Sequence, residues 1–187
     1  MAQVSTNEFR PGMKVELDKE PYVITSNEFV KPGKGQPFNR VKLKHLLTGR
    51  VVEKTFRSGE KFPLADIEET KMRLLYREGN DFIFMDEKTY EQHSVPITVI
   101  GEKEAWCMED IEYELLFYKG EIVDLTPPNF MELIVTETAP GLRGDSSGRV
   151  LKPATLETGA KIKVPIFINE GEKIKVDTRT GEYASRV

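Results

Sequence analysis

The stretch "FNRVKLKHLL", residues 38–47, alternates apolar and charged side chains, which predicts a half-buried β-strand. Because successive side chains of a strand point to opposite faces, Val41 and Leu43 would face a core, and His45 would pack on the same side. The opposite face would be cationic and would carry Arg40, Lys42 and Lys44. The same alternation in "MKVELD", "PYVIT" and "RVVEKTF" predicts further strands on either side of this one.

The middle of the chain predicts a meander of strands with one short helix. In residues 65–95, "ADIEETKMRLLYREGNDFIFMDEKTYEQHSV", the turn "EGND" separates two apolar strands and "DEKT" follows the second. The segment 97–111, "ITVIGEKEAWCMEDI", predicts a short helix, with Trp106 and Cys107 as core residues. Residues 113–125, "YELLFYKGEIVDL", predict a hairpin that turns at "YKGE". The following "TPPN" ends the strand, since two successive prolines cannot donate ladder hydrogen bonds.

The carboxyl-terminal third again predicts short strands, separated by turns at "APG", "ETG", "NEGE" and "RTGE". The strands therefore fall into three predicted domains, 1–64, 65–127 and 128–187. Domains of roughly 60 residues can protect the edges of their sheets by closing them into small barrels. The predicted fold class is all-β, with three small β-barrels in tandem.

Charge is unevenly distributed along the chain, although the net charge is only −4. Residues 1–64 hold 12 Lys and Arg against 7 Asp and Glu, residues 65–126 hold 6 against 16, and residues 127–187 hold 9 against 8. The cationic excess is concentrated in residues 31–61, which is typical of a surface that binds a polyanion. A solvated strand face is the alternative interpretation.

Composition and motifs exclude several classes of protein. The chain is 39% hydrophobic and 31% charged, and no apolar run approaches the roughly 20 residues of a membrane helix. The amino terminus lacks the pattern of a secretory signal, so we expect a cytoplasmic location. The single cysteine, Cys107, cannot form an internal disulfide. Phosphate-loop, paired-histidine and dinucleotide motifs are absent from the sequence, so we expect no cofactor, no metal and no catalytic residue.

The motif "GDSSG", residues 144–148, raises one enzymatic alternative. It is similar to the sequence around the nucleophile of chymotrypsin-like proteases, with Ser146 in the place of the nucleophile. That chemistry needs a histidine base, an orienting carboxylate and two large barrels, whereas the two histidines of this chain lie in different predicted domains. A serine hydrolase is therefore disfavoured, and the chain is not expected to be an enzyme.

The loop "FVKPGKGQPF", residues 29–38, presents a single cation on a turn. Lys34 lies between Gly33 and Gly35, and Pro32 is one of two prolines that limit the freedom of the loop. From these residues alone, Lys34 is interpreted as a solvated turn residue.

Four segments of the chain resemble bacterial translation elongation factor P: "FVKPGKGQPFNRVKLKHLLTGRVVEKTF", "TPPNFMELIVTETAPGLRGDSSG", "KPATLETGAKIKVPIFI" and "GEKIKVDTRTGEYASRV". The resemblance covers nearly the whole chain. It implies an SH3-like (KOW-like) barrel over 1–64 followed by two OB-fold barrels, the first of them acidic, in an L-shaped arrangement that resembles tRNA. In its first two domains the family is similar to the hypusine-bearing initiation factor of eukaryotes and archaea.

The resemblance implies a non-enzymatic factor that binds the 70S ribosome beside the P-site peptidyl-tRNA and relieves stalling at consecutive prolines. It would act as a monomer, by positioning the CCA end of the tRNA with a modified lysine. Lys34 occupies the family's modified position, supported by Pro32, Gly33 and Gly35. The "KPGKG" core favours β-lysylation by lysine-modifying enzymes, with an aminopentanol group as the alternative.

The resemblance also implies roles for individual residues. The phosphate contacts near the loop would come from Lys31, Arg40, Lys42 and Lys44. Tyr183 and Arg186 match the residues that contact the tRNA, where an aromatic ring and a guanidinium suit RNA. The loop that probes the small subunit near the codon matches Gly144, Asp145 and Ser146, although Ser146 stands where threonine is common in the family.

A general single-stranded RNA-binding OB-fold protein is the second hypothesis. Such modules present clustered exposed aromatic side chains on one strand face. In this sequence Phe82, Phe84 and Tyr90 lie in the acidic domain, which would repel RNA, so this hypothesis is disfavoured.

Overall fold

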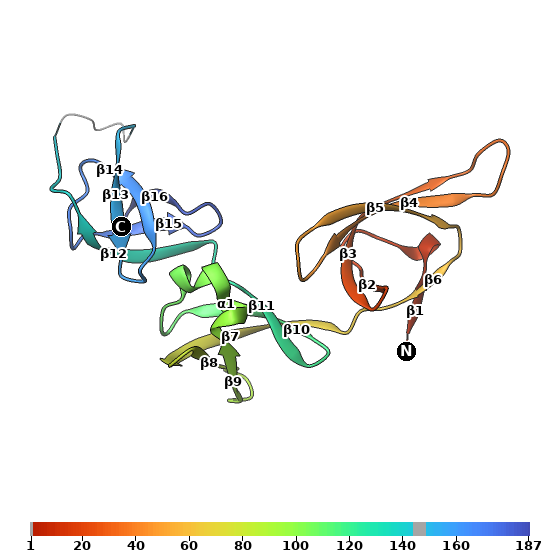
Figure 1. Cartoon of the computed structure of the whole chain (residues 1–187), viewed down its shortest axis with the longest axis horizontal. Helices are drawn as coiled ribbons and strands as arrows, with labels where there is room; N and C mark the ends of the chain where they lie inside the picture. The colour runs from red at the N-terminus through yellow and green to blue at the C-terminus, as the bar shows by residue number, and fades with distance from the viewer. Residues whose placement is uncertain (1, 144–148) are drawn as a thin grey trace. The chain divides into compact units, whose positions relative to one another are not determined.

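β-Strands are the predominant secondary structure of the chain, which confirms the predicted all-β class (Figure 1). The computed structural model describes residues 2–143 and 149–187. Their contacts form two compact units, one of residues up to 69 with 116–123 and one of residues 70–115 with 124–187. The division into three domains stays a prediction.

A four-stranded antiparallel sheet, ordered β2-β3-β4-β5, forms most of the first unit. Its strands are β2 (Lys14–Leu17), β3 (Glu20–Val30), β4 (Phe38–His45) and β5 (Val51–Arg57). The short pair β1 (Gln3–Ser5) and β6 (Lys61–Pro63), with the 3-10 turn η1 (Thr6–Glu8), adds to it. The apolar residues of these elements share one core, which includes Val15, Ile24, Val41 and Leu43.

Strand β4 has the two faces that the alternation predicted. Val41 and Leu43 are 0% exposed. The exposed side chains of the strand are Arg40, Lys42 and Lys44. His45 is buried on the same side as Val41, and its ring meets the Tyr22 ring edge-on with 4.9 Å between centroids. The expectation that His45 packs on the apolar face is confirmed.

Hydrogen bonds explain why a histidine packs at this position. The Nδ1 atom of His45 accepts the backbone N–H groups of Leu47 (3.2 Å) and Thr48 (3.1 Å). The proton of the neutral ring therefore lies on Nε2, which donates to Oε2 of Glu20 at 2.8 Å. Nδ1 thus stabilises the turn after β4, and Nε2 links the end of β4 to the start of β3.

The second sheet is five-stranded and ordered β11-β10-β7-β8-β9. Its strands are β7 (Ile67–Glu78), β8 (Asp81–Met85), β9 (Gln92–Pro96), β10 (Glu112–Tyr118) and β11 (Glu121–Thr126). Helix α1 (Ile97–Ile100) and the 3-10 helix η2 (Gly101–Trp106) connect β9 to β10, where the sequence predicts a short helix. The β10–β11 hairpin turns at Lys119 and Gly120, whose φ angles of 51° and 81° suit a tight turn. Within 2–143 and 149–187, no helix is both long enough and apolar enough to cross a membrane.

The third sheet is antiparallel and ordered β14-β13-β12-β15-β16. Its strands are β12 (Phe130–Thr138), β13 (Leu151–Leu156), β14 (Lys161–Pro165), β15 (Lys173–Asp177) and β16 (Glu182–Arg186). Its core includes Leu133, Leu156, Val164, Ile174 and Val176. Trp106 and Met108 of the helical segment pack against this core, so the segment and the third sheet belong to one unit.

Candidate functional site

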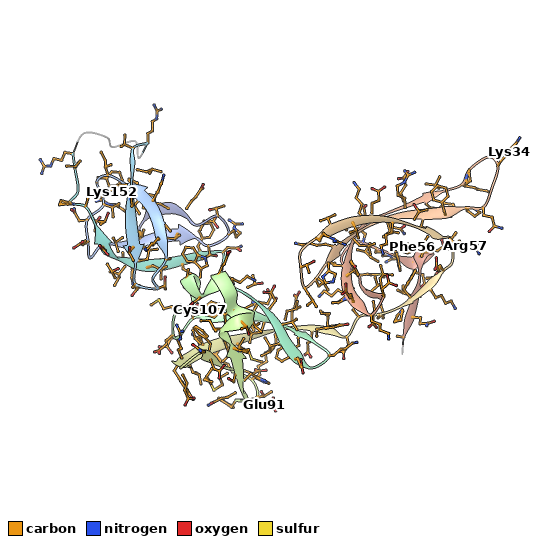
Figure 2. The ribbon with its side chains drawn as sticks, in the orientation of Figure 1. Lys34, Phe56, Arg57, Glu91, Cys107 and Lys152 are labelled. Atoms are coloured by element: carbon orange, nitrogen blue, oxygen red, sulfur yellow. The ribbon has the colours of Figure 1, made fainter. Side chains whose placement is uncertain are left out.

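Strands β3 and β4 form a long hairpin arm that carries Lys34 at its tip (Figure 2). Val30, the last residue of β3, pairs with Phe38, the first residue of β4, so residues 31–37 form the connecting loop. Lys34 is exposed, and none of the ion pairs found in the described parts of the chain involves it. Its ammonium is therefore accessible to a partner.

The backbone of the loop depends on one of its two glycines. Gly35 has a φ of +104°, in the region that residues with a Cβ rarely adopt. A Cβ added there would also lie 3.8 Å from Cγ of Pro32, which is ordinary contact. Gly33 has nothing within 4 Å of an added Cβ and no positive φ. The conformation of the loop therefore favours glycine at position 35. At position 33, neither crowding nor backbone geometry requires a glycine.

A buried polar network fixes the root of the arm. Asn39 is 1% exposed, and its Nδ2 donates to Oδ1 of Asn27 (3.1 Å) and to the carbonyl of Thr6 (3.4 Å). The Nδ2 of Asn27 donates to the carbonyls of Thr6 (3.0 Å) and Phe9 (3.2 Å). Both strands of the arm are thereby attached to the amino-terminal turn. The network was not predicted from the sequence, although an asparagine at position 39, on the face that Val41 occupies, is a signal for it.

Acidic neighbours reduce the positive charge of the β4 surface at one position. Arg40 forms ion pairs with Glu28 on β3 (3.4 Å) and with Glu53 on β5 (3.8 Å). The groove of about 410 Å³ at this surface is lined by Ser26, Asn27, Glu28, Arg40, Lys42 and Glu53. Lys42 and Lys44 have no ion pair among the described residues. The strand is cationic as predicted, but the sheet surface around Arg40 is mixed in charge.

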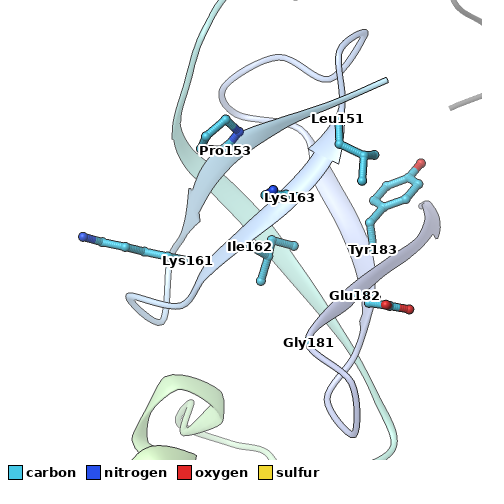
Figure 3. Close-up of a pocket in the computed structure, with 8 residues that line it drawn as sticks. All are labelled: Leu151, Pro153, Lys161, Ile162, Lys163, Gly181, Glu182 and Tyr183. Carbon is cyan, nitrogen blue, oxygen red and sulfur yellow. The ribbon is translucent and has the colours of Figure 1, made fainter. Parts of the chain in front are cut away.

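A groove on the third sheet contains Tyr183 (Figure 3). It has a volume of about 720 Å³, and its lining combines apolar and cationic side chains. The residues that line it include Leu151, Pro153, Lys161, Lys163 and Tyr183. Partial burial raises the pKa of the Tyr183 hydroxyl, which stays protonated at neutral pH. Tyr183 thus combines a packed ring with an accessible groove, which suits stacking against a base.

A β-bulge brings Tyr183 and Arg186 to the same face of the edge strand β16. Tyr183 lies opposite Val176 of β15, and Arg186 lies opposite Ile174. Residues directly opposite one another share a face, and both β15 partners point into the core. The register shift leaves Ala184 as an extra residue of β16. Without it, two residues three positions apart would point to opposite faces.

The Arg186 side chain is exposed but held in place. Its Nη2 lies 3.0 Å from Oε1 of Glu172, and its Cζ lies 4.7 Å from the centroid of the Phe167 ring. The side chain of Arg186 remains 53% exposed. Glu172 accepts from Nη2, so the oriented guanidinium would donate to a phosphate through its other nitrogens, without first being ordered.

Three predicted site residues lie outside the described residues: Gly144, Asp145 and Ser146. The hypotheses of a codon-side loop and of a serine nucleophile both depend on these residues, and both remain predictions from the sequence. Among the described residues, no group of three or more His, Cys, Asp and Glu side chains could hold a metal ion.

The thiol of Cys107 is held in its protonated form at neutral pH. Burial, with a smaller contribution from the Glu104 carboxylate, raises the pKa of the thiol to about 12. The Sγ atom donates to the carbonyl of Lys103 at 3.4 Å. Because the thiolate is the nucleophilic form, Cys107 acts as a packing residue at neutral pH.

Family models match three consecutive segments of the chain. The elongation factor P KOW-like domain matches residues 5–62, the elongation factor P OB domain matches residues 67–125, and the elongation factor P C-terminal model matches residues 131–186. The chain belongs to the elongation factor P family. It is therefore a translation elongation factor, and the resemblance seen in its sequence is confirmed.

This elongation factor is similar over its full length to curated relatives. It is 62% identical over 188 residues to Elongation factor P 2 of Protochlamydia amoebophila and 57% identical to Elongation factor P 2 of Chlamydia trachomatis. Each match covers 100% of this chain and 99% of the relative.

Two solved structures are also similar to this elongation factor. Eukaryotic translation initiation factor 5A from Methanococcus jannaschii has a TM-score of 0.51 at 25% identity, covering 66% of this chain and 95% of that one. An initiation factor 5A family protein from Naegleria fowleri has a TM-score of 0.55 at 16% identity, covering 67% and 97%. At this low identity the second likeness concerns the fold alone.

Proposed function

We propose that this factor binds the 70S ribosome beside the P-site peptidyl-tRNA and stimulates peptide bond formation at consecutive prolines. The observation that carries the proposal is the presentation of Lys34, exposed and without an ion pair in the described chain, at the end of a hairpin arm. A side chain at the end of such an arm can enter a narrow site that the body of the domain cannot. The factor would act as a cytoplasmic monomer of three domains, 1–64, 65–127 and 128–187.

Positioning alone can supply the proposed stimulation. The ring of proline fixes φ and makes its nitrogen a constrained nucleophile, so poor alignment at the reaction centre is a physical cause of stalling. Holding the CCA end of the tRNA near its reactive geometry lowers the entropic part of the barrier. This mechanism needs no acid, base or cofactor from the factor, and the proposed function is accordingly non-enzymatic.

Modification of Lys34 extends its reach. A β-lysyl group added to Nζ lengthens the side chain and adds a second amine beyond the first. The exposed loop is accessible to a modifying enzyme, and the φ of +104° at Gly35 sets the local path of the backbone. We propose lysine-modifying enzymes as partners, with β-lysylation favoured by the sequence of the loop.

The basic residues of the first unit are not equally able to contact phosphates. Lys31, Lys42 and Lys44 are exposed and free of ion pairs among the described residues, so they can approach phosphates directly. Arg40 would first have to leave Glu28 and Glu53, which offsets part of its gain. We therefore propose the three lysines as the main contacts and Arg40 as a weaker one.

The contacts of the third sheet with tRNA are assigned to Tyr183 and Arg186. Their common face and the fixed guanidinium support this assignment. The assignment of Gly144, Asp145 and Ser146 to the small-subunit side stays a prediction from the sequence.

A reconstituted translation assay tests the proposed function. Ribosomes translating a message with three consecutive prolines are expected to stall, and the modified factor is expected to restore synthesis past that point. A message with the prolines replaced by alanines is the control, and the factor should leave its rate unchanged. Equal stimulation of both messages would contradict a function specific to proline.

One observation favours the alternative of general single-stranded RNA binding. The groove that contains Tyr183 also includes Lys161 and Lys163 of β14, so an aromatic ring lies beside two cations, a combination that suits single-stranded RNA. Binding of a free single-stranded RNA as tightly as of the ribosome would support this alternative.

Replacement of Tyr183 or Arg186 by alanine is expected to weaken binding to ribosomes that carry a peptidyl-tRNA. The loss should be about 10-fold for each, since stacking or a phosphate contact contributes roughly 1–3 kcal/mol. Ser185→Ala is the matched control, because Ser185 lies between the two and is exposed. Affinity measured by equilibrium binding, with a thermal melt of each variant, provides the test. If Ser185→Ala weakens binding equally, or if the variants unfold early, the assignment is wrong.

A further inference from the structure

Lys152 is a charged side chain buried in the third sheet (Figure 2). It is 9% exposed, and its Nζ donates to the carbonyls of Ala139 and Ile168, the latter at 2.5 Å. No carboxylate within the described residues forms an ion pair with it. Burying an ammonium is costly unless its protons are hydrogen-bonded, so the two carbonyls explain how Lys152 is accommodated.

The Ile168 carbonyl belongs to the turn between β14 and β15, residues 166–172, here called the β14–β15 turn. The N–H of Leu142 donates to the carbonyl of Ile166 (2.9 Å), and the N–H of Ile166 donates to the carbonyl of Val150 (3.1 Å). Lys152 adds a link from Ile168 to Ala139, the residue that follows β12. One side of the turn is therefore attached to the segments that flank β12 and β13.

Gly141 brings the same segment into close contact with the turn. Its N–H donates to Oδ1 of Asn169 at 2.7 Å. A Cβ added at Gly141 would lie 2.7 Å from that oxygen and 2.9 Å from the carbonyl of Phe167. The backbone of this segment thus packs directly on the turn, with no room for a side chain between them.

The β14–β15 turn also holds Arg186. Phe167 lies under the guanidinium, and Glu172 forms its ion pair. The other carboxylate oxygen of Glu172 accepts the N–H of Asn169 at 2.9 Å, so Glu172 is itself oriented by the turn. Both groups that orient Arg186 therefore belong to the segment that Lys152 fixes.

We infer that Lys152 is a positioning residue for Arg186. Its ammonium fixes the β14–β15 turn, and the turn fixes the direction of the Arg186 guanidinium without any contact between Lys152 and RNA. The inference rests on the proposed role of Arg186 in binding tRNA. A neutral side chain at 152 would leave the carbonyls of Ala139 and Ile168 without this donor, and the turn would gain alternative conformations.

A double-mutant cycle tests the inference. Lys152→Met, Arg186→Ala and the double variant are compared for affinity to ribosomes that carry a peptidyl-tRNA. We expect Lys152→Met to weaken binding about 10-fold, and the double variant to bind no more weakly than Arg186→Ala alone. Lys175→Met, which removes a charge from an exposed position on β15, is the control and should change affinity far less.

A spectroscopic readout separates positioning from general destabilisation. The Cζ atom of Arg186 lies 4.7 Å from the centroid of the Phe167 ring, so the side-chain resonances of Arg186 should show a ring-current shift in the parent. Lys152→Met should reduce this shift while the resonances of the β12 and β15 core stay in place. If Lys152→Met fails to fold, Lys152→Gln replaces it, because an amide removes the buried charge while keeping a donor for one of the two carbonyls.

The outcomes are distinguishable. If Arg186→Ala leaves affinity unchanged, the proposed role of Arg186 fails and this inference fails with it. If Arg186→Ala weakens binding but a folded Lys152→Met binds normally, or if the two losses add fully in the double variant, the inference about Lys152 alone is overturned. If Lys152→Gln is the variant used, the same two results decide in the same way.

Discussion

Lys34→Arg is expected to reduce the rate of peptide bond formation at three consecutive prolines about 100-fold relative to the modified parent. The charge and the approximate length of the side chain are kept, but a guanidinium cannot receive the lysyl group. The arm would then end short of the CCA end of the tRNA, and a displacement of about 1 Å at a reacting centre can have an effect of this size. The measurement is the rate of tripeptide synthesis in a reconstituted translation system.

The matched comparison uses modified Lys34, unmodified Lys34 and Lys34→Arg in the same assay. Only the first is expected to act strongly. Lys34→Ala is less informative, since it removes charge and modification together. If Lys34→Arg, made in cells with intact modifying enzymes, restored synthesis as well as the parent, a simple electrostatic role for position 34 would replace the positioning mechanism.

Leu43→Ala is expected to lower the free energy of unfolding of the first unit by about 2–5 kcal/mol. Leu43 is 0% exposed and lies in one core with Val15, Ile24 and Val41. Truncation leaves a cavity that the β2–β5 sheet can fill only in part, because Leu43 is paired on both sides, with Ile24 of β3 and Val52 of β5. Urea denaturation followed by circular dichroism gives the change directly.

Lys42→Ala is the control for this experiment, because Lys42 is the next residue on the same strand but points to solvent. Its stability should change by no more than about 0.5 kcal/mol, whereas its ribosome affinity should fall and depend less steeply on salt. A large loss of stability in Lys42→Ala, or a small one in Leu43→Ala, would mean that the two faces of β4 are assigned wrongly.

The local pattern of residue types was sufficient to predict much of the fold. The alternation in residues 38–47 predicts a strand with one apolar face, because a helix would place Leu43 on the side opposite Val41 and His45. Turn residues such as Lys119 and Gly120 marked where the chain reverses, since few residues tolerate a positive φ. The exposed position of Lys34 followed from glycines and prolines beside it, and its proposed modification followed from family resemblance.

Only the tertiary structure decided how the candidate contact residues are arranged. Glu28 and Glu53 neutralise Arg40 because the register of β3 and β5 places them beside it, and that register is invisible in a single strand. The bulge at Ala184 brings Tyr183 and Arg186 to one face, whereas strict alternation along the strand would place them on opposite faces.

The burial of Lys152 could not be predicted from the sequence. In the sequence it is one lysine among 27 basic residues, and its type predicts exposure. In the structure its ammonium is buried against carbonyls that lie 13 and 16 residues away. The sequence by itself thus determined the strands, the turns and the exposed lysine at the tip of the arm, because these depend on neighbouring residues. The neutralised Arg40, the shared face of Tyr183 and Arg186, and the buried Lys152 depend on contacts between distant segments, which exist only once the sheets have formed.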